Sequence, residues 1–176
     1  MNILLLSGGV DSSLIFFNLL NKTEFSCLFV DYGQTSVKEE RKAAIALCSK
    51  FNIVLEEIVI NIPTMYNDFY VAGRNLALIG IAATRCSSGD SIYIGVNKSD
   101  EDAFPDCTDV FINYLNNSLK VGYGITLKTP LLSSTKSEII KKLALTGYNS
   151  YSYCYSPIEG SPCGLCLSCL THLGAL

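Results

Sequence analysis

Short apolar runs alternate along the chain with longer stretches in which apolar residues recur every three or four positions. A run of four to eight apolar residues is typical of a buried strand, and the longer period is typical of a helix with one buried face. Strands are predicted over 2–6, 26–31, 53–60 and 91–96. Helices are predicted over 11–20, 37–51, 74–85 and 109–119, with another from a capping box at Thr135 and Glu138 to about residue 145. This alternation predicts an α/β fold, a doubly wound and mainly parallel sheet with helices on both faces.

The rest of the chain is polar, irregular or rich in cysteine. Residues 61–73 and 97–107 are predicted as loops, and residues 149–176 as a tail without regular structure. We therefore divide the chain into an α/β domain over 1–148 and this tail, which is expected to pack on the same domain. Ligands of such sheets bind at the carboxyl ends of the strands, where the loop after the first strand and Asn97 are expected to lie.

The loop between the first strand and the first helix reads Ser-Gly-Gly-Val-Asp-Ser-Ser. Gly8 and Gly9 let the backbone approach a ligand closely, because no Cβ intervenes. The unpaired N–H groups at the start of the next helix favour an anion, with the positive end of the helix dipole behind them. The loop is thus predicted to cradle a phosphate or pyrophosphate. The alternative is an ordinary strand-to-helix turn in which Asp11 caps the helix.

The composition narrows the class of partner. The 176 residues are 49% apolar and 16% charged, with a formal net charge of −3 and a pI near 5.1. This charge gives no global reason to bind nucleic acid, so a small-molecule substrate is expected. No apolar run reaches the roughly 20 residues that span a bilayer, and the first residues lack the basic flank of a signal peptide. A cytoplasmic protein without a membrane partner is predicted, and its eight cysteines are then expected to be reduced thiols.

Four of these cysteines cluster near the end of the chain with the spacing C-x8-C-x2-C-x2-C: Cys154, Cys163, Cys166 and Cys169. Two sulfurs at C-x2-C spacing reach one metal ion, and four thiolates make a closed tetrahedral zinc shell. We therefore predict a structural Zn²⁺ ion in the tail, with Gly164 supplying an unusual φ. An iron–sulfur cluster and a chance group of buried thiols are the alternatives.

The remaining cysteines and the single histidine have weaker signals. Cys27, Cys48 and Cys86 lie in strand or helix patterns and are predicted to be small core residues. Cys107 lies in a polar loop, where a packing role and a role near the substrate are both open. His172 is predicted to be a surface residue without a catalytic partner.

Further motifs resemble those of one family. They are the glycine loop, Asp31-Tyr-Gly-Gln34, Gly73-Arg-Asn75, Gly95-Val-Asn97, Pro105-Asp-Cys107 and the four-cysteine tail. In this order and context they are similar to those of the 7-cyano-7-deazaguanine synthases, the queuosine biosynthesis proteins QueC. The glycine loop resembles the PP-loop of the ATP pyrophosphatases and is not a Walker A loop. The resemblance covers nearly the whole chain and implies the adenine nucleotide alpha hydrolase-like fold of that superfamily.

The resemblance also implies a reaction. The family converts 7-carboxy-7-deazaguanine and ammonia to 7-cyano-7-deazaguanine. ATP adenylates the carboxylate, ammonia displaces AMP to give an amide, and a second activation allows dehydration to the nitrile. The implied cofactors are ATP, Mg²⁺ and Zn²⁺. The implied partners are the deazaguanine substrate and ammonia, with no direct contact to nucleic acid, and a homodimer is expected.

By the same resemblance, Lys136, Arg74 and Asp11 are the expected catalytic residues. The two cations would face the phosphates, and Asp11 or Asp31 would help to hold Mg²⁺. The residues expected to contact the nucleotide are Leu6, Ser7, Gly8, Gly9, Val10, Asp11, Ser12, Ser13, Asp31 and Gln34. Those expected to contact the substrate are Asn75, Asn97, Asp100 and Asp106. The carboxylates of this last set would accept hydrogen bonds from a guanine-like N–H edge. A surface ion pair for Arg74, and a role for Lys136 in the capping box alone, are the alternatives.

The chain departs from the family in the expected substrate loop. The family reads Asp-Tyr-Ser-Gly-Tyr-Pro-Asp-Cys, whereas residues 100–107 here read Asp-Glu-Asp-Ala-Phe-Pro-Asp-Cys, which adds Glu101 and Asp102. The chain is also shorter around 61–72 and 117–126. Three other functions stay open. They are a PP-loop tRNA thiolase, which the absence of a basic stripe disfavours, a QueC-like protein that adenylates a different deazaguanine or attaches one to a protein, and a non-catalytic zinc-bearing binding module.

Overall fold

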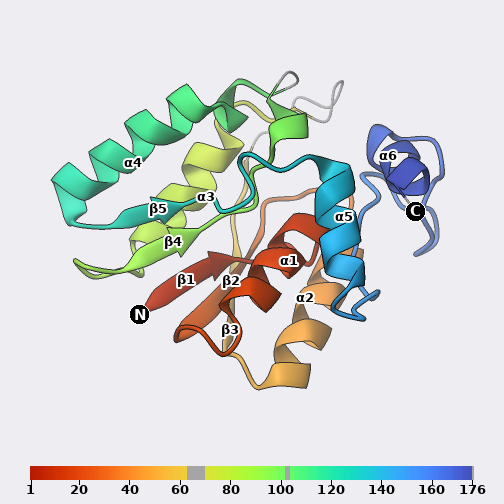
Figure 1. Ribbon diagram of the computed structural model, residues 1–176, viewed down its shortest axis with the longest axis horizontal. Helices are drawn as coiled ribbons and strands as arrows, with labels where there is room; N and C mark the ends of the chain where they lie inside the picture. Colours follow the sequence, from red (N-terminus) through yellow and green to blue (C-terminus); the bar gives the residue numbers. More distant parts are fainter. Residues whose placement is uncertain (63–69, 102–103, 176) are drawn as a thin grey trace.

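The computed structural model describes residues 1–62, 70–101 and 104–175, and within them a parallel sheet of five strands forms the centre of the molecule (Figure 1). The strand order is β3-β2-β1-β4-β5, and every neighbouring pair is parallel. The strands are β1 (Asn2–Leu5), β2 (Phe25–Asp31), β3 (Leu55–Val59), β4 (Ser91–Tyr93) and β5 (Thr126–Lys128). The predicted parallel sheet is thus confirmed, with β1 in its middle.

Helices cover both faces of the sheet, so the predicted double winding is also confirmed (Figure 1). One layer holds α1 (Val10–Leu19), α2 (Val37–Phe51) and α5 (Lys136–Ala144). The other layer holds α3 (Arg74–Ala83) and α4 (Asp109–Tyr123). The tail ends in α6 (Leu167–Ala175), which packs against α5. Two 3-10 turns, η1 (Lys98–Asp100) and η2 (Pro105–Cys107), lie in the loop before α4. No helix among the described residues is long and apolar enough to cross a membrane.

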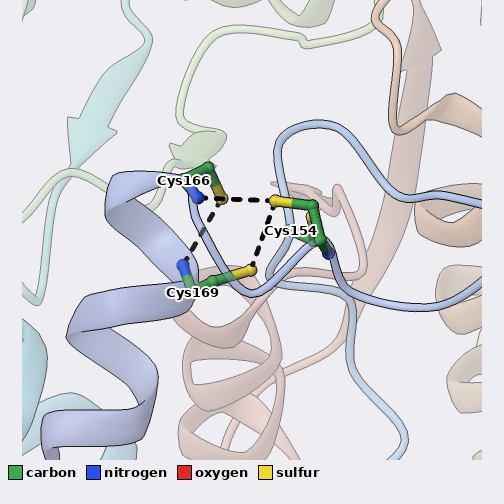
Figure 2. A group of neighbouring side chains, drawn as sticks. Cys154, Cys166 and Cys169 are labelled. Atoms are coloured by element: carbon green, nitrogen blue, oxygen red, sulfur yellow. Dashed lines mark hydrogen bonds between the residues drawn. The ribbon is translucent and has the colours of Figure 1, made fainter.

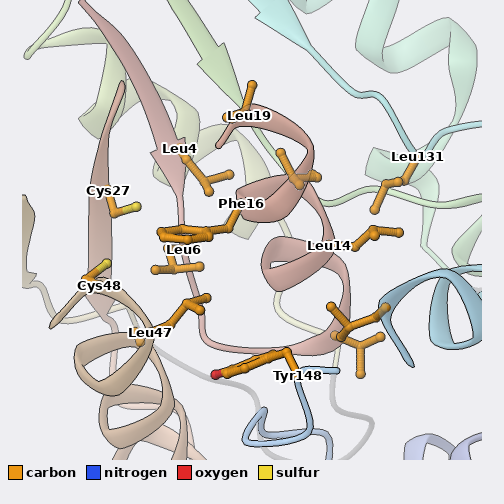
Figure 3. Close-up of a cluster of buried hydrophobic side chains, with 14 of the residues drawn as sticks. Leu4, Leu6, Leu14, Phe16, Leu19, Cys27, Leu47, Cys48, Leu131 and Tyr148 are labelled. Carbon is orange, nitrogen blue, oxygen red and sulfur yellow. The ribbon is translucent and has the colours of Figure 1, made fainter. Parts of the chain in front are cut away.

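Alternate side chains of β1 serve the two cores. Leu4 and Leu6 face the core under α1, α2 and α5, whereas Ile3 and Leu5 face the core under α3 and α4. The side-chain period of two in a strand produces this division, and burial on both faces explains why the first strand reads as a continuous apolar run. Cys27 and Cys48 lie in the first core, as predicted (Figure 3).

The sequence pattern did not predict two short elements, β5 and α6. β5 has only three residues, too few for a strand pattern to stand out, and it forms because Leu127 pairs with Ile92 of β4. The prediction that residues 149–176 lack regular structure was wrong, since α6 occupies the end of the tail. Residues 163–170 read Cys-Gly-Leu-Cys-Leu-Ser-Cys-Leu, and this alternation of cysteine and leucine at the start of the helix does not show a clear helical period. Part of the predicted 61–73 loop, and Asp102, lie outside the described residues.

The sheet has its topological switch point at β1. The chain leaves β1 toward β2 on one side and returns later to β4 on the other side. At such a point the connecting segments diverge, which leaves a crevice at the carboxyl ends of the strands. The glycine loop follows β1 and opens α1 at this crevice.

Gly8 is required here by the packing of α2. Its φ is 75°, and a Cβ at this position would lie 2.4 Å from the carbonyl oxygen of Glu40. We expect Gly8→Ala to lower the free energy of unfolding by about 2–4 kcal/mol, because it adds overpacking to backbone strain. Gly147→Ala is the matched control: its φ is 73°, but no atom lies within 4 Å of the added Cβ. It is expected to cost about 1 kcal/mol. Urea denaturation measures both, and equal losses would contradict the packing argument.

Candidate active site at the carboxyl edge of the sheet

A cavity of about 460 Å³ opens where β1, β2 and β4 end. Its walls come from the glycine loop, from the residues after β2, from the first turns of α3 and α5, and from the cysteine tail. The members of the predicted loop that line it are Leu6, Ser7, Gly9, Val10, Asp11 and Ser12. Gly8 packs against α2 instead, and Ser13 is fully buried with its hydroxyl oxygen unpaired among the described residues.

The glycine loop presents donors to this cavity. Gly9 is the N-cap of α1 with φ −80°, and no side chain caps the helix, so the alternative in which Asp11 is the cap was wrong. The first N–H of the helix that finds a backbone acceptor is that of Ser13, which donates to the Gly9 carbonyl at 3.0 Å. The preceding N–H groups of the first turn therefore have no partner within the helix. The hydroxyl oxygens of Ser7 and Ser12 lie 3.1 Å apart beside them.

Lys136 carries a positive charge into the cavity from the opposite wall. It is the first residue of α5, after a capping box formed by Thr135 and Glu138. Its ammonium group forms an ion pair with Asp11 at the start of α1. Burial lowers the pKa of Lys136, but the carboxylates of Asp11 and Asp100 outweigh burial and leave that pKa raised. The alternative that confines Lys136 to the capping box was wrong.

Asn97 and Asp100 support this ion pair from behind. Asn97 is fully buried, and its amide nitrogen donates to Asp100 and, at 3.4 Å, to Asp11. Burial raises the pKa of Asp100, and the ammonium of Lys136 opposes that rise. Neither residue is among those that line the cavity. They act on the site through Asp11 and Lys136.

Gly95 lets the segment after β4 approach the glycine loop. A Cβ on Gly95 would lie 2.8 Å from the Cβ of Asp11 and 3.3 Å from the backbone nitrogen of Ser12. A side chain here would push the start of α1 away from β4. The Gly-Val-Asn motif that ends at Asn97 thus has a steric cause for its glycine.

Arg74 supplies a second cation from the first turn of α3. Among the described residues it forms no salt bridge, so the expected alternative of a surface ion pair is not supported. It faces Tyr32 and lines the cavity. Burial lowers the pKa of Arg74, whereas Tyr32 and Asp106 raise it, and the net shift is upward. Arg74 is therefore held as a cation in a partly buried position.

Asn75 links the cavity to two buried residues behind it. Its backbone N–H donates to Asp106 at 3.4 Å, and its side-chain amide donates to the Cys107 sulfur at 3.6 Å. Of these three residues only Asn75 lines the cavity. Burial raises the pKa of Cys107 to about 12, so its thiol is neutral at physiological pH. Cys107 belongs to the core under α3 and α4, which decides for a packing role.

Glu40 lines the cavity as well, although its pattern in the sequence indicates only an acid in the first turn of a helix. Its carboxylate accepts hydrogen bonds from Gln34 at 3.0 Å and from Ser36 at 2.8 Å. Burial raises its pKa, and these two donors oppose the rise. Asp31, the first residue of the Asp-Tyr-Gly-Gln motif that ends at Gln34, pairs with Arg41 and is not among the residues that line the cavity.

The cysteine tail closes one side of the cavity. Ser152 donates its N–H to the Gly8 carbonyl at 2.9 Å and pairs with Gly9 in a parallel bridge. The hydroxyl of Thr35 donates to the carbonyl oxygen of Tyr155, so the residues after β2 hold the tail too. His172 from α6 also lines the cavity and is buried, so the prediction that it is a surface residue was wrong.

Within the described residues the four tail cysteines form one compact group, with all sulfur atoms within 4.8 Å of one another. In Figure 2, Cys166, just before α6, and Cys169, in the first turn of α6, face Cys154, which lies in the preceding loop. Backbone N–H groups of the knuckle donate to sulfur, among them Cys163 to Cys154 at 3.2 Å. Gly164 has φ 73°, as the knuckle was expected to need. The donor set and its size suit a tetrahedral metal ion.

The comparisons with known proteins identify the family of the chain. The family model described as "Queuosine biosynthesis protein QueC" matches residues 1–69 and 61–176. The chain belongs to the QueC family. Among the curated relatives of this family member, the 7-cyano-7-deazaguanine synthase of Picrophilus torridus is 32% identical over 96% of this chain and 84% of the relative. The synthases of Campylobacter fetus and Chlorobium phaeobacteroides are each 30% identical, over 96% and 98% of this chain and 88% and 90% of the relatives.

Solved structures share the fold of this QueC family member. A predicted subunit of a tRNA methyltransferase from Methanocaldococcus jannaschii aligns with a TM-score of 0.57 at 18% identity, over 82% of this chain and 74% of that one. The NH3-dependent NAD synthetase of Campylobacter jejuni aligns with a TM-score of 0.51 at 19% identity, over 84% and 64%. At these identities the likeness concerns the fold alone.

Proposed function

We propose that this chain is an ATP-dependent carbon–nitrogen ligase that converts 7-carboxy-7-deazaguanine and ammonia to 7-cyano-7-deazaguanine. One observation supports the proposal above the others. In a chain of the QueC family, a glycine loop with free N–H donors faces Lys136 and Arg74 across one cavity. Adenylation releases pyrophosphate, and fixed donors and cations around the phosphates stabilise the charge that develops there.

Each residue is assigned a role according to the wall of the cavity on which it lies. The N–H groups that open α1, with the hydroxyls of Ser7 and Ser12, bind phosphate oxygens. Lys136 has its ammonium at Asp11, next to those N–H groups, so it neutralises charge on the phosphates as the bond to pyrophosphate breaks. Arg74 approaches from the wall of α3 and orients the substrate carboxylate or a phosphate. Asn97 donates a hydrogen bond to Asp100, and the carboxylate of Asp100 attracts the ammonium of Lys136 and helps to hold it in place.

The substrate is expected on the side of α3. Asn75 lines the cavity there and offers its amide directly, whereas Asp106 accepts from the backbone of Asn75 and positions it. Asn97 and Asp100 do not line the cavity and instead position Asp11 and Lys136, which do. The proposed contact residues therefore form two layers, with Asn75 nearest to the ligand.

Two metal ions fit the residues present. Mg²⁺ is bound in proteins by one or two carboxylates together with substrate phosphates, and Asp11 lines the cavity beside the glycine loop. Mg²⁺ there would offset phosphate charge. Asp31 is engaged by Arg41 and stands outside the cavity. The four tail cysteines suit Zn²⁺, whose closed shell would brace the tail and leave no position for substrate.

Ammonia as the nitrogen donor and a homodimer complete the proposal. The reaction needs a nitrogen nucleophile to displace AMP from the adenylated carboxylate. For the dimer, the supporting feature is a row of leucines on and before α6, each at least 55% exposed: Leu165, Leu167, Leu170 and Leu173. Apolar patches of this kind are typical of contact surfaces.

A direct assay tests the reaction. The purified protein is incubated with ATP, Mg²⁺, ammonia and 7-carboxy-7-deazaguanine, and AMP, pyrophosphate and the nitrile are measured by mass spectrometry. We expect two AMP and two pyrophosphate per nitrile, because the carboxylate and the amide are each activated once. Omission of ammonia should leave only the adenylated acid and its hydrolysis products. Release of pyrophosphate without nitrile would overturn the proposed product and favour another deazaguanine or a protein acceptor.

A further inference from the structure

His172 lines the cavity, yet the reaction as proposed gives it no role. Its side chain is 7% exposed, and its Nδ1 atom is enclosed without a hydrogen-bond partner among the described residues. Because Nδ1 is enclosed, a polar contact of this ring in the cavity can be made only through its other nitrogen, Nε2.

The ring of His172 is fixed before any ligand arrives. It stacks on Tyr153 with 4.0 Å between ring centroids and 20° between planes, and Tyr151 meets it edge-on at 5.6 Å. A side chain held in this way loses little conformational freedom on binding. The ring is thus preorganised for a contact in the cavity.

The ring meets the cavity through the edge opposite to Nδ1, because Nδ1 is enclosed. A neutral imidazole has one N–H, and a buried N–H without an acceptor is costly. The proton therefore belongs on Nε2, which makes this atom a donor toward the cavity. A donor in such a place suits an oxygen atom of a ligand, above all an anionic one.

The position of His172 selects the kind of anion. Ser152 is bound to the glycine loop through the Gly8 carbonyl, and Tyr153 is the next residue in the chain. The Tyr153–His172 pair therefore stands beside the loop that offers N–H donors to phosphate. Lys136 lines the same cavity from α5.

We propose that His172 binds the pyrophosphate part of the nucleotide through its Nε2–H group and retains pyrophosphate after the bond to AMP breaks. This inference rests on the proposed function, since it assumes that the cavity takes ATP. It assigns a binding residue to the cysteine tail. The tail then contributes a donor to the site in addition to closing it.

Binding measurements on three proteins test the proposal. Isothermal titration calorimetry with inorganic pyrophosphate and, separately, with AMP is carried out on the wild type, His172→Phe and His172→Gln. Phenylalanine keeps a flat ring against Tyr153 and has no N–H, whereas glutamine restores a donor. We expect His172→Phe to bind pyrophosphate about ten- to a hundred-fold more weakly, the effect of losing a hydrogen bond to a charged group. His172→Gln should recover to within about threefold, and affinity for AMP should stay unchanged.

Two results would overturn this inference alone: wild-type affinity for pyrophosphate in His172→Phe, or equal losses for pyrophosphate and AMP, which would indicate a displaced tail. The metal content of each variant is measured as well, and it should equal that of the wild type. A wild-type protein that binds neither AMP nor pyrophosphate would overturn the proposed function together with the inference. The two failures are therefore distinguishable.

Discussion

Replacing Lys136 with alanine is expected to slow pyrophosphate release by about 10²–10³-fold, the loss seen when one preorganised charge is removed from a transition state. The ammonium of Lys136 sits at Asp11, beside the N–H groups that open α1. Its raised pKa keeps it charged throughout the neutral range. Because the charge acts mainly as the phosphate bond breaks, kcat should fall far more than KM for ATP rises. Initial rates of pyrophosphate release measure both.

Two variants control this result. Lys142→Ala removes an exposed lysine from the same helix and should leave the rate unchanged. Lys136→Arg keeps the charge but replaces a compact ammonium with a planar fork, so partial activity is expected. A Lys136→Ala protein that retains half of the wild-type rate would show that the glycine loop alone carries the phosphate chemistry.

Replacing Cys166 with serine is expected to remove the zinc ion, lower the melting temperature and reduce activity at least tenfold. A structural zinc ion contributes about 10–16 kcal/mol to the folding of zinc-finger peptides, so the tail would lose most of its order. The tail holds Ser152 on Gly8 and carries His172 into the cavity. Loss of the ion is therefore expected to open the cavity as well as to destabilise the chain.

Metal analysis, thermal unfolding and the nitrile assay measure these effects on one preparation. Cys86→Ser is the matched control, because this thiol is half-buried beside α3 and outside the four-sulfur group. It should keep about one zinc per chain and full activity. Cys166→Ser protein that is free of metal but unfolds at the wild-type temperature would contradict a structural role for the ion.

The order of elements was predictable because it depends on local pattern. β1 and β2 are buried on both faces and read as continuous apolar runs, and α2 begins and ends at the predicted residues. β5 escaped prediction, since three residues form a strand only through their pairing with β4. α6 escaped because it has only nine residues and begins inside the cysteine cluster, whose spacing was interpreted as an irregular metal knuckle.

The site was predictable as a set of residues and not as an arrangement. Spacing identified the glycine loop and the four cysteines, because phosphate and metal binding demand neighbours in sequence. Glu40 and His172 gave no such signal. Glu40 reads as an acid in a first helical turn, and His172 as a polar residue near the chain end, yet both line the cavity. Whether these two side chains face the cavity or the solvent depends on which elements pack against their helices.

The sequence by itself determined the parallel α/β fold, the glycine loop after β1 and the cysteine cluster, because each depends on residues that lie close together along the chain. The tertiary structure decided that Lys136 meets Asp11 across 125 residues, that Gly8 serves the packing of α2, and that the tail is a wall of the cavity. The physical reason is that a side chain's partners across the sheet are set by the winding of the whole chain, and no local period records them.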